Sequence, residues 1–213
     1  MATTQPAFPT DIFTEPAQID VRTLDNLGPL RRMAGIWRGE TGLDVKPKAD
    51  GPRQQAYVER MELQPIDPVT NGPQLLYGLR YVTLITKPEQ VKTYHEQVGY
   101  WLWEPATQIV MHTLSIPRGM TAMAGGGVAP DATDFEIVAK YGDPCWGIVS
   151  NPFLDHAFRT EEFRIRVTFN PDGSWRYTES TMLRIRGQEA LFDHKDDNLL
   201  VRVEAPTPNP LAR

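Results

Sequence analysis

The sequence has very little cysteine and no long apolar run. Its one cysteine, Cys145, excludes an internal disulfide and a metal site built from several thiolates, and this predicts a reducing, cytoplasmic compartment. Nowhere do about eighteen apolar residues follow one another, so we expect no membrane-spanning helix. The first residues also lack a basic start followed by an apolar stretch, and we therefore predict no secretory signal.

Positive charge is scarce as well. The chain has 22 Lys and Arg against 27 Asp and Glu, a net charge of −5, so it lacks the positive field that a phosphate backbone requires. Nucleic acid is therefore not expected as a partner. The Gly-x-Ser-x-Gly, His-Glu-x-x-His and phosphate-loop signatures are missing, which argues against a hydrolase and a nucleotide-binding enzyme. The sequence leaves the oligomeric state open, a homodimer included.

What the sequence does contain is a two-residue alternation of apolar and polar residues that begins at Ile36. It runs without exception through residues 163–169, which predicts a strand with one face inside and one in water. Residues 170–173, Asn-Pro-Asp-Gly, supply a turn, and Trp175 resumes the pattern, so a hairpin is predicted. Similar segments recur along the chain and predict an all-β fold, an antiparallel barrel of about ten strands closed on itself.

The segments outside this pattern set the expected domain limits. Residues 1–22 are polar and contain several prolines, which predicts an extended arm, and residues 206–213 predict a Pro-rich tail after a single barrel domain at 23–205. Apolar residues at spacings of three predict one short helix over residues 23–33. The glycine run at residues 124–127 predicts a flexible turn.

The four histidines are the side chains best suited to binding a metal through an imidazole nitrogen. His95 lies on a predicted strand either face of which is a plausible interior. His112 and His156 are interpreted as structural or loop residues. His194 leaves two interpretations open, an imidazole that turns inward at the barrel rim or a solvated charged turn, and its three neighbouring aspartates favour the turn.

Three motifs resemble those of the nitrobindins, a haem-binding β-barrel family whose barrel is similar to that of fatty-acid-binding proteins and lipocalins. Residues 33–42 resemble the family's glycine–tryptophan–glycine first strand after a short helix. Residues 94–101 resemble its histidine and glutamate followed by a glycine and two aromatic residues, and residues 57–59 resemble its second strand more loosely. The resemblance covers roughly residues 30–203.

The resemblance implies a ferric b-type haem near the barrel mouth, bound through a histidine close to the last strand. It also implies nitric oxide chemistry and isomerisation of peroxynitrite to nitrate. His194 is the histidine in that region and would be the iron ligand, while His95 would be a pocket histidine. The further haem contacts that we expect are Trp37, Trp101, Thr113 and Arg118.

Two other functions stay open. A non-catalytic carrier of a fatty acid or another apolar ligand would need only a cavity and a polar anchor such as Arg80, Tyr81 or Arg118. An enzyme acting on a polar substrate would use Arg118 and Glu96 inside the barrel. A charge-lined cavity would favour this last function over the haem protein and the carrier.

Overall fold

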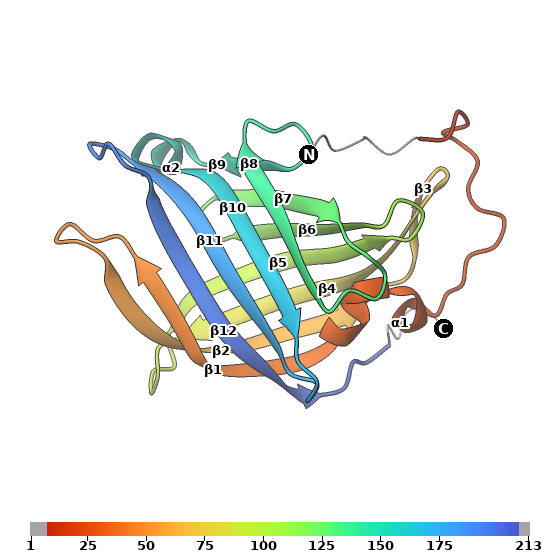
Figure 1. The fold of residues 1–213 in the computed structure, drawn as a ribbon, viewed down its shortest axis with the longest axis horizontal. Coiled ribbons are helices and arrows are strands. Elements are labelled where there is room, and N and C mark those ends of the chain that lie inside the picture. The colour runs from red at the N-terminus through yellow and green to blue at the C-terminus, as the bar shows by residue number, and fades with distance from the viewer. Residues whose placement is uncertain (1–7, 209–213) are drawn as a thin grey trace.

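The computed structural model describes residues 8–208, which form a closed β-barrel with short helices at its two ends (Figure 1). The all-β barrel predicted from the two-residue alternation is therefore confirmed. The strands and helices have the following bounds: α1 Thr23–Asn26, η1 Gly28–Met33, β1 Gly35–Lys46, β2 Arg53–Pro65, β3 Val69–Asn71, β4 Gln74–Thr86, β5 Thr93–Glu104, β6 Ile109–Ile116, β7 Met120–Gly127, β8 Asp134–Tyr141, β9 Gly147–Ser150, α2 Pro152–Ala157, β10 Phe158–Phe169, β11 Trp175–Ile185 and β12 Phe192–Glu204.

Closure of the barrel depends on β2. This strand pairs with β1 on one side and with β4 on the other, which joins the two ends of the strand order β2-β1-β12-β11-β10-β8-β9-β7-β6-β5-β4. The short β3 pairs with β4 alone and stands outside this ring. The described residues thus contain twelve strands, eleven of them in the wall, rather than about ten. The short strands β3 and β9 account for the difference.

The hairpin of β10 and β11 shows how the alternation of apolar and polar residues places side chains inside the barrel. Phe163, Ile165 and Val167 are buried, and β10 pairs with β11 through Phe169 and Trp175 as the sequence predicted. In the turn, the amide of Ser174 donates to the Asp172 carboxylate. Every second side chain of the hairpin therefore enters the barrel, where it must either pack or line a space.

The end of the barrel next to α1 is closed by packed side chains. Leu27, Leu30 and Met33 are fully buried there, and the ring of Trp103 packs against Gly28. The sequence predicted one helix over these residues, but the structure has two short turns, because Gly28 adopts a positive φ of 52° between them. The three-residue spacing of the apolar residues still predicts the buried face correctly. This helical segment, residues 23–33, closes the barrel at this end, and we call it the plug.

Two segments expected to be irregular belong to regular elements. The glycine run at residues 124–127 is part of β7, where the ring of Trp146 covers Gly125 so closely that a side chain would collide with it. The flexible-turn prediction is therefore wrong: the run is part of a strand, in which Gly125 makes room for an aromatic ring. Residues 151–156, interpreted as a loop around His156, contain most of α2, whose first turn is capped by Asn151 through the amides of Phe153 and Leu154.

The described segments before and after the barrel both lie near the end of β2. Residues 8–22 of the predicted arm contain no helix or strand and run past β3, where Thr70 donates to Glu15. Residues 206–208 follow β12, and the amide of Thr207 donates to Gln64. The rest of the predicted arm and tail, residues 1–7 and 209–213, lies outside the described residues. No helix among residues 8–208 is long and apolar enough to cross a membrane.

Leu30→Ala tests the plug. Because Leu30 is fully buried, we expect the substitution to lower the free energy of unfolding by about 2–5 kcal/mol, measured by urea denaturation. Leu43→Ala is the control, since Leu43 is 38% exposed on β1 and should cost much less. Equal losses in the two variants would show that the helical segment does not close the barrel.

Candidate functional site

A cavity of about 430 Å³ opens at the end of the barrel opposite the plug, within the range of roughly 300–1,000 Å³ typical of small-molecule pockets. We call it the open cavity. Its apolar wall comprises Met61, Ile85, Leu114, Ile116, Met120, Leu154, Phe158, Phe163 and Leu183. Its polar lining includes Asp44, Lys46, Tyr57, Glu59, Thr83, Tyr94, His95, Gln97, Arg118, Thr160, Tyr177, Glu179, Thr181, His194 and Asp196.

His194 lies inside a strand and faces the open cavity. The last strand, β12, begins at Phe192, well before the segment in which the sequence indicated a strand. Its inward positions are His194, Asp196, Asn198 and Leu200, of which the last two are buried. The solvated-turn interpretation is therefore wrong, because the aspartates that favoured it alternate between the two faces of a strand.

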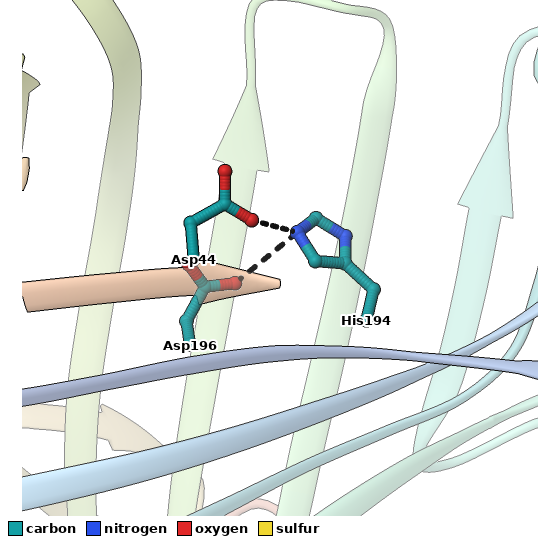
Figure 2. A group of neighbouring side chains, drawn as sticks. All are labelled: Asp44, His194 and Asp196. Carbon is teal, nitrogen blue, oxygen red and sulfur yellow. Dashed lines mark hydrogen bonds and ion pairs between the residues drawn. The ribbon is translucent and has the colours of Figure 1, made fainter. Parts of the chain in front are cut away.

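Asp44, His194 and Asp196 converge at the mouth of this cavity (Figure 2). Nε2 of His194 is 2.8 Å from Oδ1 of Asp44 and 3.5 Å from Oδ2 of Asp196. Burial alone would lower the pKa of His194, but the Asp44 hydrogen bond and the two carboxylate charges outweigh it and raise that pKa. Burial also raises the pKa of Asp196 to about 6.

The second oxygen of Asp44 is held separately. The Tyr94 hydroxyl donates to Oδ2 at 2.5 Å, and Nζ of Lys46 lies 3.3 Å from the same oxygen while also donating to the Tyr94 hydroxyl. The side chain of Asp44 is only 4% exposed. Burial opposes ionisation, yet the hydrogen bond from His194, followed by that from Tyr94 and the charges of His194 and Lys46, keeps the pKa of Asp44 below its ordinary value. Asp44 is therefore a fixed carboxylate with one oxygen directed at His194.

His95 is a neutral imidazole on the same cavity. Its Nε2 lies 3.0 Å from Oε1 of Gln97, whose amide donates to the Tyr81 hydroxyl. Since Oε1 can only accept, we assign the proton to Nε2, which leaves a lone pair on Nδ1, 3.5 Å from the Arg118 guanidinium. Burial, with a further contribution from the Arg118 charge, lowers the pKa of His95.

Two more carboxyl groups lie deeper in the barrel. Glu59 accepts hydrogen bonds from Thr83, Tyr177 and Asn198 at 2.6–2.9 Å, and burial raises its pKa. Glu179 also faces the cavity, and no described residue hydrogen-bonds or ion-pairs with it. Burial raises the pKa of Glu179 strongly, with the charges of Asp196 and Glu59 adding to the effect.

A glycine makes the deeper cluster possible. A Cβ on Gly39 would lie 2.1 Å from the Asn198 amide, so only glycine lets Asn198 lie flat across β1 and reach Glu59. Gly39 belongs to the first-strand motif that carried the family resemblance. The glycine of this motif is therefore needed for the packing of the protein itself, whether or not a ligand is bound.

Two of the expected haem contacts lie in the packed half of the barrel. Trp37 donates through Nε1 to the Met33 carbonyl oxygen and meets Trp175 edge-to-face at 5.8 Å. Trp101 stacks on His112 with ring centroids 3.9 Å apart, and both residues are buried. Neither tryptophan lines the open cavity, because inward-facing side chains near the plug are used to fill the core. Burial lowers the pKa of His112 to about 3, so this imidazole is neutral.

Other expected site residues face outward. On β6 the even-numbered residues Val110, His112 and Leu114 enter the barrel, which leaves Thr113 on the outer surface. Glu96 is exposed on β5, where the inward positions are His95 and Gln97, so Glu96 is not inside the barrel. Arg80 is also exposed on β4. Of the predicted contacts, the structure brings His95, His194 and Arg118 together around the cavity.

Sequence reasoning missed the carboxyl groups. Asp44, Glu59 and Glu179 were not singled out, and Asp196 was assigned to a turn. A signal was present, since residues 194, 196 and 198 are polar at the inward period of a strand. Asp44, Glu59 and Glu179, on β1, β2 and β11, are distant in the sequence from these three residues. Only the pairing of the strands brings these side chains together.

The description of a protein family fits this architecture. A family model described as the THAP4-like, heme-binding beta-barrel domain matches residues 26–202, most of the chain. The chain belongs to this haem-binding β-barrel family. The resemblance indicated by the sequence motifs is thereby confirmed.

One solved structure supports the fold of this family member. Rv2717c from M. tuberculosis superposes with a TM-score of 0.57 at 22% sequence identity, over 86% of this chain and 99% of that chain. At this identity the likeness shows the fold alone. Among proteins with curated descriptions, none matches the chain significantly.

The residues around His194 do not fit an axial haem ligand in the arrangement observed. Haem iron takes an imidazole nitrogen with an available lone pair, but Nε2 of His194 is hydrogen-bonded to Asp44 and faces Asp196. The other ring nitrogen, Nδ1, is bonded to Cγ, the ring carbon that is attached to Cβ. A haem bound through Nδ1 would therefore have to lie close to the backbone of β12. One imidazole between two carboxylates is the donor set of a divalent ion rather than of haem.

Titration of His95 tests the assigned proton. We expect its pKa, followed by imidazole NMR shifts, to lie below the ordinary value of about 6.5, and to rise in Arg118→Gln because a nearby positive charge is removed. A lowered pKa means that the unfolded chain binds this proton more readily. The His95 contribution to stability is therefore lost as pH falls through about 6.5. A His95 pKa that is unchanged in Arg118→Gln would contradict this geometry.

Proposed function

We propose that this family member binds a small ligand in its open cavity, in contact with His95, His194 and Arg118. The observation that carries the proposal is a cavity with an apolar wall and ionisable groups that lack partners. Glu179 has no hydrogen-bond or ion-pair partner among residues 8–208, and the Arg118 guanidinium there has no carboxylate within ion-pair distance. Buried or cavity-facing polar groups are normally paired, so these two side chains are suited to meeting a polar ligand.

Haem b is the first ligand to test, because the family is a haem-binding one. Haem would supply an iron centre for nitric oxide binding and peroxynitrite isomerisation, the activities that the motif resemblance implies. In this chain, binding through His194 would first require its imidazole to leave Asp44. The apolar wall and the neutral His95 favour haem, while the carboxyl groups oppose it.

A carrier of apolar ligands and an enzyme for a polar substrate remain alternatives. Arg118 at the mouth could bind a ligand carboxylate, as a fatty-acid carrier requires. Four carboxyl groups face the same space, at Asp44, Glu59, Glu179 and Asp196, which disfavours a long hydrocarbon tail. The charged lining therefore supports a compact ligand with polar groups over a fatty acid, and by the criterion given above it favours the enzyme for a polar substrate.

Leu114→Trp tests whether the cavity is the binding site. Leu114 points inward from β6, and a tryptophan there should fill the space and abolish binding of hemin and of the fluorescent probe anilinonaphthalene sulfonate. Thr113→Trp is the matched control, because the adjacent side chain points outward. We expect it to bind both probes as the wild type does. Equal binding by both variants would exclude the open cavity.

Asp44→Asn tests the fit of haem. Hydrogen bonds to charged groups contribute about 1.5–3 kcal/mol, so weakening the one that holds His194 should raise hemin affinity by about tenfold or more. The Soret band of Asp44→Asn should depend on His194, whereas Asp193→Asn, an outward change on the same strand, should behave as wild type. Tight, His194-dependent hemin binding by the wild type would instead show that the observed arrangement already accepts haem.

A further inference from the structure

Three inward carboxyl groups lie side by side across neighbouring strands at the mouth of the barrel. In the strand register, Asp44 of β1 is opposite Asp196 of β12, and Asp196 is opposite Glu179 of β11. All three line the open cavity. Like charges directly opposite each other on paired strands destabilise a sheet. This row is therefore costly unless something positive lies between its members.

The positive groups already present lie beside Asp44 and Asp196 and leave Glu179 without one. His194 lies between Asp44 and Asp196, Lys46 contacts the second oxygen of Asp44, and Arg118 ion-pairs with no carboxylate among the described residues. Glu179 is half-buried, faces the cavity and has no hydrogen-bonding or ion-pairing group among residues 8–208. An unpartnered interior carboxyl next to Asp196 is a second, independent sign that a cation belongs here.

The donor atoms at the mouth converge as ligands of one ion do. Oδ1 of Asp44, Nε2 of His194 and Oδ2 of Asp196 lie within 4.8 Å of one another, and the two distances from Nε2 are 2.8 and 3.5 Å (Figure 2). Ligand atoms about 2.1 Å from one metal, at angles of about 90–110°, are roughly 3.0–3.4 Å apart. The two distances from Nε2 are therefore close to those between ligands of one ion.

The surroundings would hold this site in place. The donors come from paired strands of a closed barrel, which fixes their spacing. Oδ2 of Asp44, the oxygen that is not directed at His194, accepts from the Tyr94 hydroxyl. Ligating carboxylates commonly have their second oxygen held in this way. The remaining coordination positions would face the open cavity.

We propose that Asp44, His194 and Asp196 bind one divalent transition-metal ion at the mouth of the barrel. One imidazole and two carboxylates suit Mn²⁺, Fe²⁺, Co²⁺ or Zn²⁺, whereas Mg²⁺ and Ca²⁺ prefer oxygen ligands alone. The inference goes beyond the proposed function, because it requires neither haem nor any other cavity ligand. It assigns His194 to a protein-bound ion in place of haem iron.

Cobalt binding to the full chain tests this site. After chelator treatment, we expect the wild type to bind one Co²⁺, with visible absorption bands that aqueous Co²⁺ does not give. His194→Ala and Asp196→Asn should bind Co²⁺ at least tenfold more weakly. The matched control is Asp193→Asn, one residue from His194 but facing outward beside Ser180, and it should bind as the wild type does.

Two further measurements keep the test decisive if a site variant fails to fold. In the wild-type protein, Mn²⁺ should broaden the imidazole NMR signals of His194 and leave those of the exposed surface residue His156 sharp. Lys46→Gln should bind Co²⁺ several-fold more tightly, because it removes a cation beside Asp44. Co²⁺ affinity that is unaffected by His194→Ala, or Mn²⁺ broadening that spares His194, would overturn the proposal. Neither result would bear on probe binding deeper in the cavity.

Discussion

The pairing of β2 with both β1 and β4 is the constraint on which the rest of this structure depends. Once the sheet closes, every second side chain of its wall points into one shared interior, and that interior has to be filled or left open to a ligand. The chain meets this constraint differently at the two ends. Aromatic and aliphatic side chains fill the half next to the plug, while carboxyl groups and two histidines line the other half.

Alternation predicted which residues share a face, but not which end of the barrel they occupy. His95 and Trp101 both point inward from β5, as the sequence indicated, yet only His95 reaches the open cavity. Trp101 lies further along the strand, where the core is packed around His112. Position along a strand relative to the mouth depends on the strand stagger, which no local pattern contains.

The carboxyl groups show why residue composition alone predicts the wrong secondary structure around His194. Aspartate and asparagine favour turns, so the segment around His194 looked like a solvated loop. In the barrel those same residues form a regular strand, and Asp44, 150 residues away in the sequence, accepts a hydrogen bond from the His194 ring. The sequence could indicate the family and an inward histidine. Asp44, the carboxylate that holds this histidine and argues against axial haem ligation, is brought to it only by the pairing of distant strands.

The chain enters and leaves the barrel at the plugged end. Thr23, at the start of α1, donates its hydroxyl proton to the Ile66 carbonyl oxygen, and Thr207, after β12, donates through its amide to Gln64. Both anchors adjoin the end of β2, across the length of the strand from the mouth. A further module fused beyond either anchor would therefore be tethered on the far side from the entrance. The architecture thus allows the barrel to serve as a component of a larger polypeptide while small molecules still reach its interior.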